Sequence, residues 1–284
     1  MNTISIVTPV RNASDLLIET MISISSQIGL GTQFNIQHII VDGQSGDDTL
    51  FRAKNFIQEN ERVGISYHII SEADSGMYDA ISKGFAVSTG EIIAYQNAGD
   101  LYHVGAFAAV NHLFMNCECT WAYGRKASMN IYGTCVSDAV AVPYLESLLR
   151  SGFHGMRKPN LGFFQQESLF FRACAIKNFD FDQFRNFRLA GDFFLILHLA
   201  KKENGFFIDA LLSGHRVHEN QLSSDKDAYF REMREVTALP GLKSLVLAIL
   251  MKILSKFPQP LLRRAHTSIM KWDSANHTWV IQQE

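Results

Sequence analysis

The sequence predicts an α/β fold, built on a mixed and mostly parallel sheet that is flanked by helices. Along the first hundred residues, short apolar, β-branched runs alternate with stretches in which apolar residues recur at helical spacing. The loops between them are short, which is typical of βαβ units that place their strands parallel in one sheet. The chain has 284 residues, 47% of them apolar and 19% charged, so it can form one large domain or two small ones with a sizeable core.

Four strands are predicted before residue 100, each a short apolar run that ends at a turn or at polar residues: Thr3–Val10, Ile36–Val41, Gly64–Ile70 and Ile92–Tyr95. Helices are predicted between them, where apolar residues recur at helical spacing: Leu17, Met21, Ile24 and Ile28, then Leu50, Ala53 and Ile57, then the stretch Tyr78–Val87. Asn12 or Ser14 is expected to cap the first helix. Ser45, with Asp48 three residues later, fits the start of the second.

The second half of the chain continues the α/β pattern. Helices are predicted over 104–115, 144–149 and 188–202, and strands over 120–129, 131–136 and 206–212. The segment Gly162–Arg172 is apolar at both ends, but Gln165, Gln166 and Glu167 at its centre would need partners if they were buried. This centre therefore either faces a cavity or belongs to an edge strand with a wet face.

Composition excludes several classes of protein. The formal net charge of −2 gives no global basic field for nucleic acid. The four cysteines follow no zinc spacing, and we expect them to be reduced thiols, mostly in the core. The N-terminus enters a strand without a basic-then-apolar leader, and no apolar run approaches the ~20 residues that span a bilayer. These features predict a cytoplasmic protein.

Each of the four predicted strands has polar residues at or just after its end. The first ends at Thr8-Pro9, the second at Asp42, the third at Glu72 to Asp74, and the fourth at Asn97 to Asp100. In a parallel sheet, ligands bind outside the carboxyl ends of the strands, so these residues predict a binding site there. The alternative is that they are solvated loop residues without a shared role, as polar loops often are.

Four of these stretches carry a family resemblance. They read SIVTPVRN (Ser5–Asn12), IIVDGQSGDDT (Ile39–Thr49), SEADSGMYDAISKG (Ser71–Gly84) and TGEIIAYQNAGD (Thr89–Asp100). Together, in this order and spacing, they resemble the family 2 glycosyltransferases with the GT-A fold, closest to the bacterial enzymes that build exopolysaccharide, O-antigen and capsule. Later stretches around Gln166 and Asp192 resemble the family more loosely.

The resemblance implies an inverting transfer of a sugar from a nucleotide-diphosphate donor to a hydroxyl of a glycan or lipid-linked acceptor. The donor-binding residues that it implies are Thr8, Pro9, Arg11, Asp42, Asp74, Gly76, Lys83 and Asp100. It also implies that Asp192 is the general base, since an acceptor hydroxyl is a poor nucleophile until a carboxylate takes its proton. Asp192 lies in the first turn of an apolar helix, where an N-cap role alone would also explain it.

The implied metal site departs from the family pattern. The family's Asp-x-Asp element reads Asn97-Ala98-Gly99-Asp100 here, so one carboxylate remains to hold Mg²⁺ or Mn²⁺. Asn97 could add an oxygen, and His218 a nitrogen by analogy with a downstream histidine of relatives. Gln165 stands where relatives often have histidine, which leaves Gln166 and Glu167 as the acceptor-side residues. Metal dependence stays open.

The chain divides into a glycosyltransferase domain over 1–222, with a nucleotide-sugar half (1–100) and an acceptor half (101–222), and a helical, basic-amphipathic extension over 223–284. In Leu242–Phe257 a helical wheel gathers apolar residues on one side, opposite Lys252 and Lys256. Trp272 could anchor this extension in a membrane interface, at the inner face of the membrane. The alternative is a helix that packs on the catalytic domain or on another subunit of an oligomer.

Two other functions compete with the transferase. A sugar nucleotidyltransferase would carry a glycine-rich loop after the first strand, but Val10 to Ala13 contain no glycine. A non-catalytic nucleotide- or carbohydrate-binding relative would fit the depleted metal motif and predicts binding without turnover.

Overall fold

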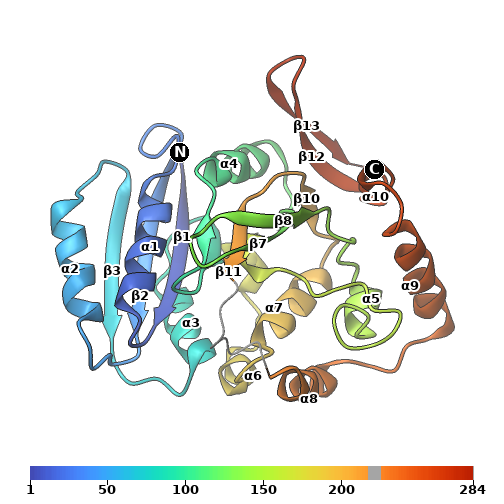
Figure 1. Cartoon of the computed structure of the whole chain (residues 1–284), viewed down its shortest axis with the longest axis horizontal. Coiled ribbons are helices and arrows are strands. Elements are labelled where there is room, and N and C mark those ends of the chain that lie inside the picture. Colours follow the sequence, from blue (N-terminus) through green and yellow to red (C-terminus); the bar gives the residue numbers. More distant parts are fainter. Residues whose placement is uncertain (217–224, 284) are drawn as a thin grey trace.

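The computed structural model describes residues 1–216 and 225–283 of the chain, and its centre is a nine-stranded sheet flanked by helices (Figure 1). The strand order is β13-β12-β10-β6-β9-β4-β1-β2-β3. In chain order these strands are β1 (Asn2–Val10), β2 (Phe34–Asp42), β3 (Ile65–Ser71), β4 (Ile92–Tyr95), β6 (Trp121–Tyr123), β9 (Leu169–Arg172), β10 (Phe206–Ile208), β12 (Ser268–Asp273) and β13 (Thr278–Gln283). Most neighbouring pairs are parallel, so the predicted fold class is confirmed.

The N-terminal half is the predicted βαβ arrangement, with β3, β2, β1 and β4 side by side and parallel. The helices between them are α1 (Ser14–Ser25), α2 (Thr49–Glu59) and α3 (Met77–Ala86). The predicted caps are wrong, because neither α1 nor α2 has a side-chain cap bond. The Asn12 and Ser45 side chains instead join the two loops: Asn12 Oδ1 accepts the Gly46 N–H, and Ser45 Oγ accepts the Asn12 N–H.

Strand β9 lies inside the sheet and pairs antiparallel with β4 on one side and β6 on the other. The edge-strand interpretation of Gly162–Arg172 is therefore wrong. The short 3-10 helix η1 (Gln166–Ser168) precedes β9, and its three residues are buried. The polar centre of this segment therefore lies directly before an interior strand of the sheet.

A second, four-stranded sheet has the order β5-β11-β7-β8, with β5 (Leu101–Tyr102), β7 (Lys126–Met129), β8 (Cys135–Ala139) and β11 (Ser213–Arg216). Strand β5 directly follows the loop at the end of β4, and it pairs antiparallel with β11. The pairing brings residues 213–216 beside residues 101–102. This contact assembles the site from two distant parts of the chain.

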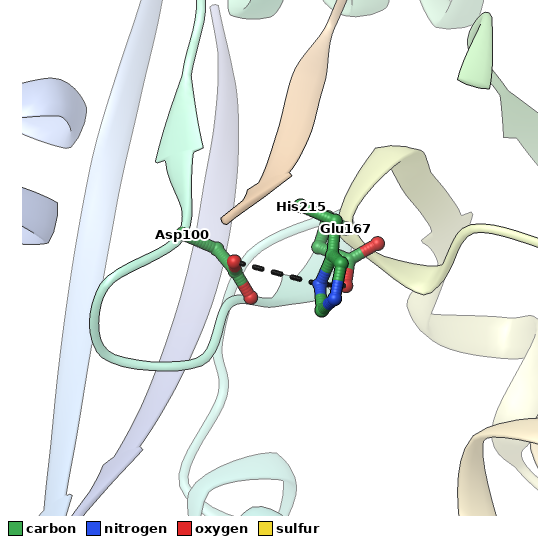
Figure 2. Close-up of side chains that lie close together, drawn as sticks. All are labelled: Asp100, Glu167 and His215. Atoms are coloured by element: carbon green, nitrogen blue, oxygen red, sulfur yellow. Dashed lines mark hydrogen bonds and ion pairs between the residues drawn. The ribbon is translucent and has the colours of Figure 1, made fainter. Parts of the chain in front are cut away.

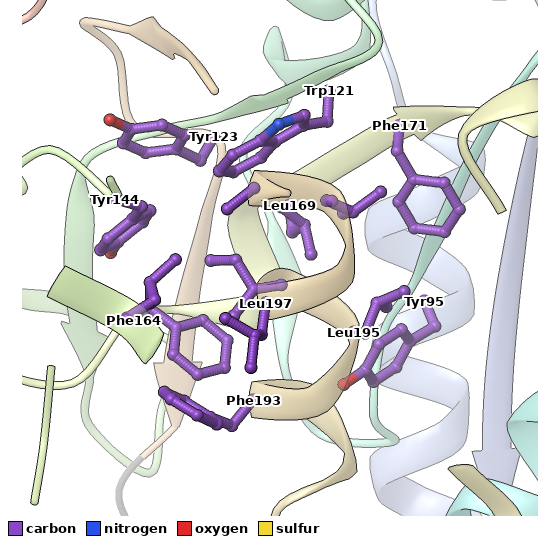
Figure 3. Packing of buried hydrophobic residues seen from close by; sticks show 14 of the residues in the cluster. Tyr95, Trp121, Tyr123, Tyr144, Phe164, Leu169, Phe171, Phe193, Leu195 and Leu197 are labelled. Carbon is purple, nitrogen blue, oxygen red and sulfur yellow. The ribbon is translucent and has the colours of Figure 1, made fainter. Parts of the chain in front are cut away.

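The helix α7 (Gly191–Ala200) packs in the middle of the largest apolar cluster (Figure 3). Phe193, Leu195 and Leu197 lie among aromatic residues of β6 and its surroundings, including Trp121 and Tyr144. Fully buried side chains of this size stabilise a fold by about 1.5–3 kcal/mol each. The start of α7, which carries Asp192, is therefore held by a dense core. The other helices of this half are α4 (Ala106–Asn116), α5 (Glu146–Arg150), η2 (Ala173–Ile176) and α6 (Phe181–Asn186).

The C-terminal part begins with α8 (Lys226–Val236), α9 (Leu242–Leu254) and α10 (Gln259–Arg263) and then forms a hairpin of β12 and β13. The predicted helical extension is therefore wrong for the hairpin, where β12 pairs with β10 and extends the large sheet. Alternating aromatic and β-branched residues favour strands here, and Trp272 meets Trp279 across the hairpin with ring centroids 5.3 Å apart.

Helix α9 has two apolar faces rather than one. Leu247, Met251 and Leu254 pack against the main core, whereas Leu250 and Ile253 on the outer side stay half exposed. None of the described helices is long and apolar enough to cross a membrane. All four cysteines are free thiols, and Cys119 alone is buried, so the expectation of mostly core thiols is wrong.

Candidate active site

The loop between β4 and β5 buries the side chain of Asp100. Gly99 adopts a φ of 103°, which favours glycine, and its N–H donates to the Thr20 hydroxyl over 2.9 Å. The same hydroxyl donates to the Asp100 carbonyl over 3.0 Å. Helix α1 therefore fixes the loop from outside, and the carboxylate turns inward with 6% of the residue exposed.

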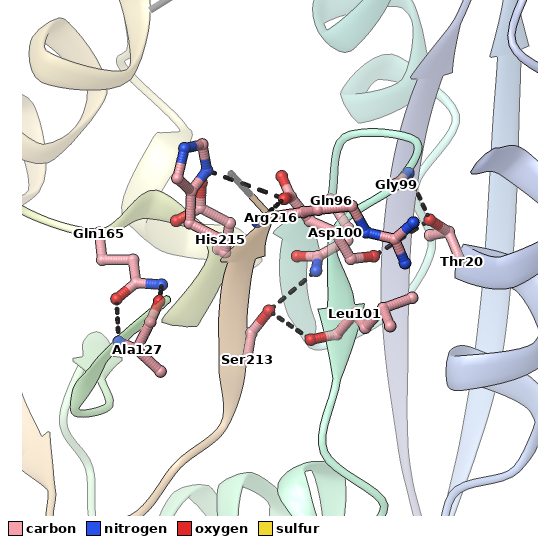
Figure 4. A network of polar contacts seen from close by, with 11 residues as sticks. Thr20, Gln96, Gly99, Asp100, Leu101, Ala127, Gln165, Ser213, His215 and Arg216 are labelled. Carbon is pink, nitrogen blue, oxygen red and sulfur yellow. Dashed lines mark hydrogen bonds and ion pairs between the residues drawn. The ribbon is translucent and has the colours of Figure 1, made fainter. Parts of the chain in front are cut away.

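A series of hydrogen bonds joins strand β11 to this loop (Figure 4). Gln96 Nε2 donates to Ser213 Oγ over 2.8 Å, and Ser213 Oγ donates to the Leu101 carbonyl over 2.9 Å. The backbone N–H of Arg216 donates to Asp100 Oδ1 over 2.9 Å. Each contact crosses between the β4–β5 segment and β11, so residues 213–216 have a fixed position relative to Asp100.

Asp100, Glu167 and His215 converge at this point (Figure 2). His215 Nδ1 lies 3.1 Å from Glu167 Oε1 and 3.7 Å from Asp100 Oδ1, and one donor atom from each of the three residues lies within 4.8 Å of the others. Two carboxylates and an imidazole are a donor set that suits a divalent cation. Burial first, and then the charge of Glu167, raise the pKa of Asp100 to about 7. A bound cation would relieve this crowding of negative charge.

The predicted metal ligands agree only in part with this cluster. Asp100 belongs to it, whereas His218 lies outside the described residues. Glu167 was expected on the acceptor side, and the histidine chosen as the metal ligand was His218 rather than His215. Asn97, a candidate oxygen ligand, has a buried Oδ1 without a hydrogen-bond partner among the described residues. Sequence reasoning missed the grouping because it depends on the pairing of β5 with β11.

Asp192 lies in the first turn of α7 and is partly exposed. Its Oδ1 accepts the Phe193 N–H over 2.7 Å and the Tyr229 hydroxyl over 2.9 Å. The N-cap residue of α7 is Ala190, so the interpretation of Asp192 as a helix cap is wrong. Burial first raises the pKa of Asp192 to about 7; the hydrogen bonds from Tyr229 and Phe193 act to lower it, and the charge of Glu167 acts to raise it.

The phenol of Tyr95 is buried and is affected by the charges of both Asp192 and the metal-candidate carboxylates. Burial first, and then the charges of Tyr78, Asp192, Glu167 and Asp100, raise the pKa of Tyr95 well above its ordinary value. Its hydroxyl has no hydrogen-bond partner among the described residues. The phenol of Tyr95 is therefore neutral.

Thr8 and Asp42 end β1 and β2 and are both buried. Thr8 Oγ1 lies 2.9 Å from His38 Nε2, and burial lowers the pKa of His38 to about 3, so this imidazole is neutral. Asp42 accepts the Ser71 hydroxyl over 2.7 Å and the Ser45 N–H over 3.1 Å. These contacts hold the strand ends together. Pro9 is buried in β1 beside them.

Arg11, Gly43 and Asp74 meet just beyond these strand ends. A side chain on Gly43 would collide with the Asp74 carboxylate and would come within 3.5 Å of Arg11 Cδ. Asp74 Oδ1 also accepts the Gly76 N–H over 3.1 Å, at the start of α3. Lys83 supports the same loop, because its Nζ donates to the Ala73 carbonyl over 2.6 Å and pairs with Glu72 at 3.1 Å. The predicted donor residues of this half are therefore neighbours at one edge of the sheet.

The two adjacent glutamines before β9 differ completely. Gln165 is satisfied, since it accepts the Ala127 N–H over 2.6 Å and donates to the Ala127 carbonyl over 2.7 Å. Gln166 is buried, and neither its oxygen nor its nitrogen has a partner among the described residues. A buried amide without partners costs about 1–3 kcal/mol, so Gln166 is a candidate to bind a ligand. The cavity interpretation of this segment stays a prediction.

Comparison with known proteins gives one family match. Residues 5–121 match the sequence model described as glycosyl transferase family 2. An uncharacterized glycosyltransferase of Mycobacterium tuberculosis, recorded for two strains, is 32% identical over 100 residues, which are 35% of this chain and 35% of the relative. The chain thus matches about a third of the length of these curated relatives. The match confirms the resemblance seen in the first hundred residues.

Solved structures are similar over most of the chain. The Staphylococcus aureus protein TarS, residues 1–349, superposes with a TM-score of 0.57 at 12% identity and covers 93% of this chain and 69% of its own. The mannosyltransferase PcManGT of Pyrobaculum calidifontis, solved with GDP-Man and Mn²⁺, gives a TM-score of 0.57 at 15% identity and covers 92% of this chain and 73% of its own. At this identity the likeness concerns the fold, and it confirms the predicted GT-A architecture.

Proposed function

We propose that this chain, whose residues 5–121 match glycosyl transferase family 2, is an inverting enzyme that moves a sugar from a nucleotide-diphosphate sugar to a hydroxyl of a glycan or lipid-linked glycan acceptor. One observation carries the proposal: Asp100, Glu167 and His215 converge in one cluster, and the charge of Glu167 also acts on the carboxyl group of Asp192. This arrangement combines a carboxylate for proton removal with ligands for a cation, which are the two groups that such a transfer needs.

The cluster would hold Mg²⁺ or Mn²⁺ through the carboxylates of Asp100 and Glu167 and the imidazole of His215. The bound cation supplies positive charge at the position where the leaving diphosphate develops negative charge. Mn²⁺ accompanies the donor sugar in the mannosyltransferase of similar fold. The nucleotide would lie along Thr8, Pro9, Arg11 and Asp42. Asp74, Gly76 and Lys83 would line the donor pocket.

Asp192 would act as the general base. Its pKa of about 7 means that the carboxylate is available near neutral pH and still accepts a proton readily. A base of this kind contributes about 10²–10⁴-fold to a reaction rate. Gln166, with its unpartnered amide, would bind a hydroxyl on the acceptor side. Synthesis of a surface polysaccharide is the role that fits such an acceptor.

The outer face of α9 supports a location at the inner surface of the cytoplasmic membrane. Val246, Leu250, Ile253 and Phe257 are between 48% and 52% exposed, and α9 lies at the edge of the molecule in Figure 1. From Thr237 to Trp272 the chain contains six Lys or Arg residues and no Asp or Glu. An apolar face within such a basic segment complements anionic headgroups around an apolar bilayer.

A thermal-shift panel of UDP-glucose, UDP-N-acetylglucosamine, GDP-mannose, a dTDP-sugar and a CMP-sugar, each with and without Mn²⁺, tests the donor side. Ligands that bind the folded state raise the melting temperature, and we expect one nucleotide class to do so more strongly with Mn²⁺. Release of nucleotide diphosphate from that donor tests turnover. Binding without any release, with every acceptor and with water, would favour the non-catalytic alternative. No shift with any donor would refute the proposal.

A further inference from the structure

Helix α8 contacts the proposed base and the segment that leads to it. Tyr229 is 8% exposed, and its hydroxyl donates to Asp192 Oδ1 over 2.9 Å. One turn later, Glu232 accepts backbone N–H groups with both oxygens: Oε1 from Arg188 over 3.1 Å, and Oε2 from Leu189 and Ala190 over 2.9 and 2.7 Å. One face of α8 therefore contacts both the Asp192 carboxylate and the backbone directly before α7.

We propose that α8 positions the base: Tyr229 orients the Asp192 carboxylate, and Glu232 fixes the start of α7 on which Asp192 lies. This inference rests on the proposed function, because it takes Asp192 as the base. Tyr229 and Glu232 are positioning residues that act through Asp192 and its backbone. Both lie beyond the segment 5–121 that matches the family model, so neither is assigned by that match.

Glu232 gives the backbone before α7 an acceptor from another helix. The N–H groups of Arg188, Leu189 and Ala190 precede the first turn of α7, and all three donate to the Glu232 carboxylate. The negative charge of Glu232 also lies near the positive end of the α7 dipole. The carboxylate therefore fixes the segment from which α7 begins. Asp192 follows two residues after Ala190, so its position depends on this contact.

Tyr229 approaches Asp192 from within a packed aromatic group. Its ring lies 5.7 Å from that of Phe163, which itself stacks on Phe230 at 5.9 Å. The hydroxyl is therefore aimed by packing as well as by its hydrogen bond. Both this hydroxyl and the Phe193 N–H bind Oδ1, and two donors on one oxygen fix the plane of the carboxyl group.

The hydrogen bond from Tyr229 also affects the protonation of the base. It stabilises the ionised carboxylate, so it lowers the pKa of Asp192 against burial and the charge of Glu167, which raise it. The charge of Asp192 also acts on Tyr78 in α3 and on Tyr95 in β4, and both phenols are neutral, because burial first raises the pKa of each well above its ordinary value. Loss of the Tyr229 hydroxyl must therefore raise the pKa of Asp192 further.

Titration of the full-length protein labelled with ¹³C at the Asp carboxyl carbons tests this inference without any substrate. The Asp192 signal is assigned by its loss in Asp192→Asn, and wild type should titrate at about 7. In Tyr229→Phe we expect the midpoint to rise by about one unit, because the ionised carboxylate loses a hydrogen bond that stabilises it. Tyr132→Phe is the matched control, because Tyr132 is 83% exposed. An unchanged midpoint in Tyr229→Phe would overturn the role of the hydroxyl.

Release of nucleotide diphosphate from the donor that gives the largest thermal shift tests the positioning itself. We expect Glu232→Ala to lower kcat about tenfold or more with little change in KM, and Glu232→Gln, which keeps an acceptor oxygen, to recover part of the loss. Adding either change to Asp192→Asn should lower the residual rate no further. Wild-type kcat in Glu232→Ala, with Asp192→Asn inactive, would refute the α8 inference alone. Wild-type rates in Asp192→Asn would refute the base of the proposed function instead.

Discussion

The backbone N–H of Arg216 donates a 2.9 Å hydrogen bond to the Asp100 carboxylate, between residues 116 positions apart. This contact places the neighbouring His215 within reach of both Asp100 and Glu167. The candidate metal site is therefore made of one residue from the end of β4, one from η1 and one from β11. Its geometry depends on the pairing of β5 with β11 as much as on the identity of its ligands.

Metal binding should depend on His215 as well as on Asp100. We expect Mn²⁺ to raise the melting temperature of the wild-type protein, because a ligand of the folded state stabilises it. His215→Ala and Asp100→Asn should each lose most of this shift. His277→Ala is the control, since His277 is exposed in the β12–β13 hairpin and should keep the full shift. An equal Mn²⁺ shift in His215→Ala and wild type would exclude His215 from the site.

The rate of transfer should rise with pH through about 7. The base must be ionised, and the pKa of Asp192 is raised to about 7, so kcat/KM should increase up to that pH and level off above it. Asp192→Asn should lower kcat by about 10²–10⁴-fold and leave donor binding intact. Kinetics from pH 5.5 to 9, with donor affinity from the thermal shift, measure both. A flat pH profile in the wild type would argue against Asp192 as the base.

The stability of the protein should also depend on the ionisation of Asp192, but it should fall as the pH rises, whereas the rate of transfer increases. Asp192 ionises near pH 4 in an unfolded chain but at about 7 in the folded one, so the unfolded state loses its proton first. The free energy of unfolding therefore falls between about pH 4 and pH 7. Asp192→Asn does not ionise, and it should melt at a higher temperature than wild type at pH 8, with the difference vanishing near pH 4. A lower melting temperature of the variant at pH 8 would contradict the raised pKa.

The two neighbouring glutamines should respond in opposite ways to truncation. Gln165→Ala leaves the buried N–H and C=O of Ala127 without partners, so we expect it to destabilise the fold by about 1–3 kcal/mol. Gln166→Ala removes an amide that has no partner among the described residues, so it should leave stability unchanged or slightly higher. The rate with a saccharide acceptor should fall in Gln166→Ala. Urea unfolding measures the stability of both variants, and transfer kinetics measure their rates. A large destabilisation in Gln166→Ala would mean that the role of Gln166 is structural.

Membrane association should depend on the outer face of α9. Leu250→Glu puts a negative charge on this face, and we expect it to abolish sedimentation with vesicles of phosphatidylglycerol and phosphatidylcholine. Ile131→Glu is the matched control, because Ile131 is 58% exposed but lies in the β7–β8 turn. Binding of the wild type should weaken with added salt, since screening reduces attraction to anionic lipid. If the wild type failed to sediment with these vesicles at low salt, the membrane proposal would be wrong.

Local pattern was sufficient for the N-terminal half of the fold. Apolar runs and helical spacing predicted β1 to β4 within two residues at each end. Strands β1, β2 and β4 are mostly buried, and buried parallel strands consist of nearly continuous apolar residues that are easily recognised. The C-terminal hairpin was missed, since Trp272 was interpreted as an interfacial anchor whereas it pairs with Trp279 and β12 adds to the sheet. A mixture of basic and apolar residues suits an amphipathic helix and a half-exposed strand equally well.

Residue type, local spacing and short motifs were enough to predict the α/β class and the family resemblance, and to propose Asp100 and Asp192 as site residues. The tertiary structure alone decided which side chains surround them. Glu167 and His215 join Asp100, and Tyr229 joins Asp192, through pairings between segments that are far apart in the chain. The physical reason is that a hydrogen bond or a metal ligand requires atoms a few ångströms apart, and one-dimensional patterns carry no information about such distances.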